Sequence, residues 1–188
     1  KIFIQGRSQN QFVSWVGLYQ MRNGHRLNII KNLAQNGESS KGCYDRIADL
    51  LALEPTLVLM QAPGINDETH QIDTLSEYQT NAYNKLTIDA ILASGAKLVL
   101  LTITPVYTGE ARATKAAMAR VIRKNEYLRQ YCANKPNVAV IDSWRELIDP
   151  SNATGLALAG LNRYDNIHYS FKGANKVVKK VEAQINNW

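Results

Sequence analysis

The sequence predicts an α/β protein, a three-layer α/β/α sandwich in which helices cover both faces of a five-stranded parallel sheet. Two observations predict this fold. Short apolar runs alternate with stretches of helical spacing along the chain, and the runs are continuous enough to be buried on both sides. The chain has 188 residues, and domains average roughly 150 residues. We therefore expect a single domain over residues 1–188.

The predicted strands share a short apolar run that a turn residue closes. They span residues 2–5, 27–34, 56–60, 97–104 and 137–142. Gly6, Gly37, Gly64 and Pro105 close the first four. Right-handed crossovers between such strands give a doubly wound, flavodoxin-like sheet.

The predicted helices fill the intervals between the strands. One spans residues 9–22, another spans 74–94, and a third is centred on 117–131. A further helix precedes Pro55 and is marked by Tyr44, Ile47, Ala48 and Leu51. The last helix is the clearest, because its apolar residues fall on one face. They are Ala174, Val177, Val178, Val181, Ile185 and Trp188.

The composition excludes several classes of protein. Hydrophobic residues make up 45% of the chain and charged residues 20%, unlike a disordered or collagen-like chain. No apolar run approaches about 18 residues, so we expect no membrane span. The chain has no H-E-x-x-H and no paired C-x-x-C, so we expect no metal site. Cys43 and Cys132 are interpreted as buried thiols, and a single disulfide between them stays open.

The chain is basic, with 22 Lys and Arg against 16 Asp and Glu and a formal net charge of +6. This charge favours the approach of anionic partners. The densest basic stretch, residues 120–129, has helical spacing. We interpret it as a solvated helix face rather than a nucleic-acid site, so we expect no nucleic-acid partner. Nothing in the sequence indicates an oligomeric state.

Sites in a doubly wound sheet lie beyond the carboxyl ends of the strands, so the segments that follow the strands carry the candidates. Familiar motifs are absent from these segments. The chain has no Walker A motif and no G-x-G-x-x-G after a strand. It also has no G-x-S-x-G, because Asn10 stands where the second glycine of that pattern would be.

Four features of these segments could carry chemistry, and each has a plainer alternative. Ser8 lies where a helix start favours a developing anion, or it caps that helix. Gly37 lets its N–H approach a ligand, or it forms an ordinary turn. Asn66 can donate to an oxyanion, or it is a turn residue. Asp165 can hold the Nδ1–H of His168 and leave Nε2 as a base, or the two are a helix-start Asp and a surface His.

The order Ser, Gly, Asn, Asp-x-x-His resembles the SGNH (GDSL-type) hydrolase family, whose sequence blocks span nearly the whole domain. The resemblance implies a flavodoxin-like fold and ester hydrolysis by a serine nucleophile, without a cofactor or a metal. It implies that Ser8 is the nucleophile, with Asp165 and His168 as acid and base. It also implies an oxyanion hole formed by the N–H groups of Ser8 and Gly37 and the side chain of Asn66.

Position 7 departs from the common Gly-Asp-Ser block, since the chain has Gly6-Arg7-Ser8. Branches of the family with a non-acidic residue at this position are often carbohydrate acetylesterases, and this chain looks more similar to them. Arg7 either forms an ion pair within the protein or faces the cleft and attracts an anionic substrate. It is also the one feature that favours a non-catalytic glycan-binding module on the same fold.

Aromatic residues lie in or beside the segments expected to border the cleft, namely Tyr107, Trp144 and Tyr164. They either stack on sugar rings or pack within the loops. No long apolar lid is visible, so we expect a short acyl group, acetyl, on a saccharide that could be anionic. A lysophospholipase-like esterase of lipids or small esters is the alternative. The chain opens inside a strand with no signal peptide, so we expect a module of a larger extracellular, cell-surface or virion-associated protein.

Overall fold

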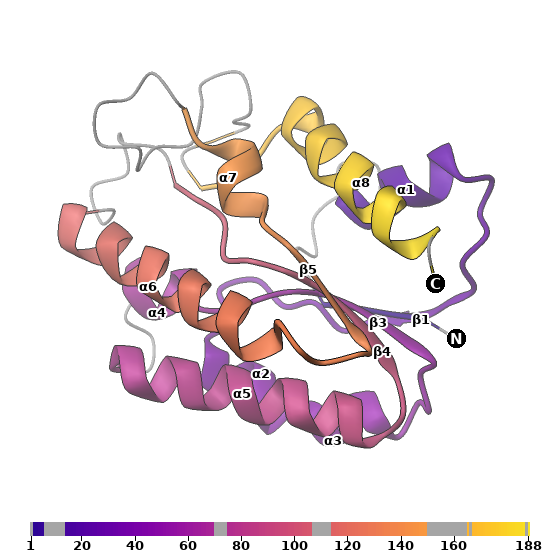
Figure 1. The fold of residues 1–188 in the computed structure, drawn as a ribbon, viewed down its shortest axis with the longest axis horizontal. Helices are drawn as coiled ribbons and strands as arrows, with labels where there is room; N and C mark the ends of the chain where they lie inside the picture. Colours follow the sequence, from indigo (N-terminus) through magenta and orange to yellow (C-terminus); the bar gives the residue numbers. More distant parts are fainter. Residues whose placement is uncertain are drawn as a thin grey trace.

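The computed structural model describes residues 2–5, 14–69, 75–106, 114–149, 165, 167–186 and 188, with the backbone alone for 2–5 and 69. The sheet is formed by β1 (Ile2–Gln5), β2 (Ile29–Asn32), β3 (Leu57–Gln61), β4 (Lys97–Leu101) and β5 (Val138–Ile141). Its order is β2-β1-β3-β4-β5, and every neighbouring pair is parallel. The predicted α/β fold with a parallel sheet is confirmed (Figure 1). This strand order is that of flavodoxin-like sheets.

The central strands are buried on both faces. Val58, Leu59 and Met60 of β3 and residues 98–101 of β4 are all fully buried, which explains why these runs are apolar throughout. The edge strand β2 is mostly exposed. Only its four residues Ile29–Asn32 pair as a strand, so the predicted run over 27–34 was too long at both ends.

Helices lie on both faces of the sheet, and each face has its own core (Figure 1). The helices on one face are α2 (Ser40–Asp45), α3 (Ile47–Leu51), α5 (Glu77–Ala93) and α6 (Lys115–Cys132). On the other face, α1 (Trp15–Arg22) lies beside α8 (Phe171–Ile185). The faces alternate along β3, because Leu59 packs toward α8 while Met60 packs toward α5.

The structure corrects several helix predictions. The helix expected through Ile47 is two short helices that meet at Arg46. Two five-residue helices, α4 (Ile65–Thr69) and α7 (Ser143–Leu147), replace predicted loops. Trp188 lies beyond α8 and is 39% exposed, so it is not part of the buried face.

The longer helices begin with side-chain caps. Ser14, Ser76, Thr114 and Ser170 each accept a hydrogen bond from the backbone N–H three residues later. Among the described residues, no helix has the length and apolar character needed to cross a membrane. Both cysteines are buried, and neither forms a disulfide.

Candidate active site

Asp165 and His168 form a closed turn directly before α8. Oδ2 of Asp165 lies 2.6 Å from Nδ1 of His168, and Oδ1 accepts the backbone N–H groups of Ile167 (2.8 Å) and His168 (2.6 Å). The backbone N–H of Asp165 donates to the carbonyl oxygen of His168 at 3.3 Å. The carboxylate therefore fixes the orientation of the imidazole through Nδ1. The spacing in the sequence predicts this contact, while the catalytic roles of the two residues stay a prediction.

The charge of Asp165 follows from these contacts. Burial opposes its ionisation, but the hydrogen bonds from the His168 side chain and from the backbone of His168 and Ile167 outweigh that effect. They hold the pKa of Asp165 below its ordinary value. The group is therefore a carboxylate at neutral pH and stabilises a protonated imidazole beside it.

Gly37 lies after β2 and Asn66 lies in α4, which follows β3, and a hydrogen bond joins these two segments. Gly37 has φ +70°, which a glycine adopts without the strain of a Cβ. Nδ2 of Asn66 donates to the carbonyl oxygen of Glu38 at 2.9 Å. An amide nitrogen carries two hydrogens, so this bond fixes the plane in which the second one points.

Arg46 holds the turn that contains Gly37 through hydrogen bonds to both of its ends. Nε of Arg46 donates to Oε1 of Glu38 at 2.8 Å, and one of its Nη atoms donates to the carbonyl oxygen of Leu33 at 3.0 Å. Both ends of the turn are thus tied to the start of α3. No pattern of residue spacing indicated this contact.

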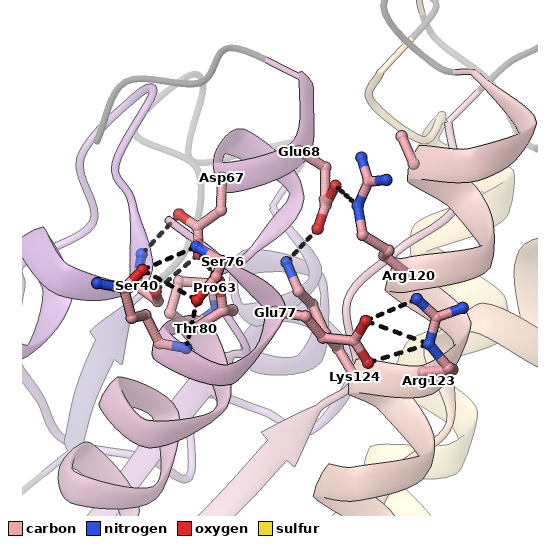
Figure 2. A network of polar contacts seen from close by, with 12 residues as sticks. Ser40, Pro63, Asp67, Glu68, Ser76, Glu77, Thr80, Arg120, Arg123 and Lys124 are labelled. Carbon is pink, nitrogen blue, oxygen red and sulfur yellow. Dashed lines mark hydrogen bonds and ion pairs between the residues drawn. The ribbon is translucent and has the colours of Figure 1, made fainter. Parts of the chain in front are cut away.

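The two residues after Asn66 are buried carboxylates that hold α4 in place (Figure 2). Asp67 accepts the backbone N–H of Ser40 (3.0 Å), the hydroxyl of Ser40 (2.7 Å) and the hydroxyl of Thr80 (2.8 Å). These bonds tie α4 to α2 and α5. Glu68 forms ion pairs with Lys124 and with Arg120 of α6, the latter at 2.7 Å.

Lys124 corrects the interpretation of residues 120–129 as a solvated helix face. Its side chain is 0% exposed, because it points at Glu68 rather than at solvent (Figure 2). Arg123, one position earlier, is 58% exposed and fits that interpretation. Sequence reasoning missed Glu68 and Lys124, because residues 56 positions apart give no local signal of their pairing.

The segments beyond β3 and β4 are packed closely against each other. Gly64 has φ +139°, and a Cβ there would lie 2.8 Å from Cδ1 of Ile103. Asn125 of α6 holds Ile103 from the other side, accepting its N–H at 2.8 Å and donating to its carbonyl oxygen at 2.9 Å. The backbone that leads into Asn66 therefore packs against Ile103, and Nδ2 of Asn84 also donates to the carbonyl oxygen of Pro63 at 3.1 Å.

Of the remaining predicted site residues, the structure describes only Trp144. Arg7, Ser8, Tyr107 and Tyr164 lie outside the described residues. Trp144 is only 6% exposed and packs in the core. Its ring offers no face to a sugar, so the loop-packing alternative applies to it.

Within the described ranges, no group of three or more His, Cys, Asp or Glu side chains could hold a metal ion.

Comparisons with known proteins point to one family. The model of the GDSL-like lipase/acylhydrolase family matches residues 3–175. A search of curated proteins finds no match. The fold is similar to that of a GDSL-like lipase from Bacteroides thetaiotaomicron VPI-5482, with TM-score 0.78, 19% identity, and coverage of 99% of this chain and 87% of that one.

Two further solved structures are similar over almost their whole length. The acetyl xylan esterase AlAXEase has TM-score 0.77 and 16% identity, with 98% of each chain covered. The psychrotrophic esterase EstA from Pseudoalteromonas sp. has TM-score 0.67 and 19% identity, with 100% of this chain and 97% of that one covered. At these identities the likeness is one of fold.

Proposed function

The chain belongs to the GDSL-like lipase/acylhydrolase family, and from that premise we propose that it is a serine esterase that removes a short acyl group, acetyl, from a carbohydrate. The observation that carries the proposal is the Asp165–His168 pair, whose Nδ1 contact at 2.6 Å orients an imidazole for proton transfer through Nε2. Membership of an esterase family supplies the reaction class, and the pair supplies the general base.

The reaction proceeds through an acyl-enzyme. Nε2 of His168 takes the proton of Ser8 as the serine oxygen attacks the acyl carbonyl. Asp165 stabilises the imidazolium that forms. The imidazolium then protonates the sugar oxygen that leaves, and water, activated by the same nitrogen, releases the acid and restores Ser8.

The negative charge of the tetrahedral intermediate is held by three donors. They are the backbone N–H groups of Ser8 and Gly37 and the side-chain N–H of Asn66. The hydrogen bond from Asn66 to the carbonyl oxygen of Glu38 supports this role, since a donor whose plane is fixed needs no reorganisation when the charge develops.

Two observations support an acetylated carbohydrate as the substrate. One of the similar structures is an acetyl xylan esterase, and Gly6-Arg7-Ser8 looks similar to the acetylesterase branch. The net charge of +6 favours a polysaccharide that also carries acid groups. A lipid or small-ester esterase is the second candidate, because a GDSL-like lipase is also among the similar structures.

The test compares p-nitrophenyl acetate with p-nitrophenyl octanoate in the wild type, in Ser8→Ala and in Ser94→Ala, a serine at the end of α5. We expect acetate to be preferred, Ser94→Ala to match the wild type, and Ser8→Ala to lose on the order of 10⁶-fold in kcat. Acetylated polysaccharides, neutral and acidic, follow as substrates. Preference for the octanoate would replace the acetylesterase proposal with the lipid one, and activity that survives Ser8→Ala would end both.

A further inference from the structure

Three consecutive residues of α4 each bind a different part of the molecule. Asn66 donates to the carbonyl oxygen of Glu38 in the turn after β2. Asp67 accepts bonds from α2 and α5, and Glu68 pairs with α6. The proposed oxyanion donor is thus the first of three attachment points that succeed each other directly in the chain.

The contact of Glu68 with α6 is the most buried ion pair among the described residues. The side chain of Glu68 is 3% exposed and that of Lys124 is 0% exposed. Arg120 pairs with the other carboxylate oxygen of Glu68, and the side chain of Arg120 is 39% exposed. A buried charge requires its partner, so Glu68 cannot move away from Lys124 without leaving an uncompensated charge (Figure 2).

The helix that carries these residues is too short to be stable in isolation. α4 has five residues, far fewer than the ~12–15 that an isolated helix needs in water. Its position therefore depends on its side-chain contacts. Because Asn66 and Glu68 share one turn of backbone, a displacement at Glu68 is passed on to the amide of Asn66.

We infer that Glu68 is a positioning residue for the oxyanion donor Asn66, with Lys124 and Arg120 holding Glu68 in place. Glu68 does not touch the substrate and acts only through the backbone of α4. The kinetic part of this inference rests on the proposed function, because the proposed function assigns Asn66 to the oxyanion hole. Its physical content, that Glu68 sets the place of the Asn66 amide, can be measured without catalysis.

The first test is a double-mutant cycle with p-nitrophenyl acetate. We expect Glu68→Gln to lower kcat by about 10- to 100-fold with KM unchanged, because the loss falls on the transition state. Asn66→Ala alone should lose about 100- to 1,000-fold. In the Asn66→Ala background, Glu68→Gln should cause almost no further loss, whereas a merely structural role would add its own loss to it.

Glu77→Gln is the matched control. Glu77 also pairs with α6, through Arg123 at 2.6 Å, but this pair lies at the surface and does not involve α4 (Figure 2). We expect Glu77→Gln to keep the kcat of the wild type. If Glu68→Gln does not fold, Glu68→Met/Lys124→Met removes both buried charges, and Arg120, which is 39% exposed, then turns its charge to solvent. Wild-type kcat in that folded double variant would overturn the inference.

The second test follows the side-chain amide of Asn66 by ¹H–¹⁵N NMR. The hydrogen bonded to Glu38 should exchange slowly in the wild type and in Glu77→Gln, and faster and at a shifted frequency in Glu68→Gln. An additive cycle, or an Asn66 amide unchanged in a folded Glu68 variant, overturns the inference. Absence of Ser8-dependent activity in the wild type counts against the proposed function alone, and the NMR result then decides the positioning role.

Discussion

Gly37 and Gly64 shape the candidate site for different physical reasons. Gly37 needs its backbone conformation, φ +70°. Gly64 combines φ +139° with a neighbour so close that a Cβ would overlap Ile103. Sequence reasoning expected a backbone role for Gly37. It could not identify the crowding at Gly64, because this crowding comes from Ile103, which lies after β4.

Gly64→Ala should therefore destabilise the fold. The added Cβ must displace Cδ1 of Ile103 from 2.8 Å, and we expect a loss of about 1–3 kcal/mol. Urea unfolding measures it. Gly24→Ala is the control, because Gly24 has φ +61° but no atom within 4 Å of the added Cβ, so only backbone strain of about 1 kcal/mol remains. Equal losses in the two variants would show that crowding contributes nothing.

Asp165→Asn tests the pair with His168. We expect kcat to fall on the order of 10³- to 10⁴-fold at pH 7, because an amide no longer stabilises the imidazolium or fixes its tautomer. The lowered pKa of Asp165 also predicts a pH dependence of stability. Its contribution is present above the ordinary pKa of about 3.9 and is lost as the pH falls through the lower pKa of the folded state.

The measurement for this prediction is urea unfolding of both proteins from pH 7 down to pH 2. The stability difference between the wild type and Asp165→Asn should be largest above pH ~4 and should shrink below it. A difference that grows on acidification would contradict the prediction.

At the scale of elements, the short helices α4 and α7 mark the limit of what periodicity can predict. Five residues give too little repetition to distinguish a helix from a turn. The cap of α7, where Asp142 accepts the N–H of Arg145 at 3.1 Å, is a signal that could have identified it. The longer helices were predicted because their apolar stripes repeat over several turns.

Asn125 joins two elements, α6 and the extension of β4, and its loss should be costly. Asn125→Leu keeps the volume but leaves the N–H and the carbonyl oxygen of Ile103 without their partner. We expect a loss of about 2–5 kcal/mol, measured as a shift in the urea midpoint. Gln130→Leu on the exposed face of the same helix should change stability by less than about 0.5 kcal/mol. A mild effect of Asn125→Leu would mean that water replaces the lost bonds.

At the scale of the whole molecule, the sequence predicted the alternation of strands and helices, the parallel sheet and the contact of Asp165 with His168. These features depend on local spacing. The burial of Lys124 was not predictable in the same way, because a lysine among Arg120, Arg123 and Arg129 has the pattern of a solvated face. The ion pair between Lys124 and Glu68 forms only when the chain folds.

The two cysteines report on unfolding of the whole molecule. Both are buried, and burial raises the pKa of the Cys132 thiol to about 11, so little reactive thiolate exists at pH 8. We expect the native protein to react negligibly with a disulfide reagent at pH 8 and both thiols to react at once in 6 M guanidinium. Rapid labelling of a native thiol would show an opening of the core that the structure does not contain.

Because α4 has three attachments, this segment should tolerate insertions and deletions even less well than substitutions. A helical residue turns the chain by about 100°, so one inserted or deleted residue near Asn66 would rotate the following side chains away from their partners all at once. A substitution at Asp67 or Glu68 disturbs one attachment, whereas a change of length disturbs every one downstream. Scanning single-residue insertions along the chain, with folding as the selection, should show this segment to be far less tolerant than the exposed turn at Ala133 and Asn134.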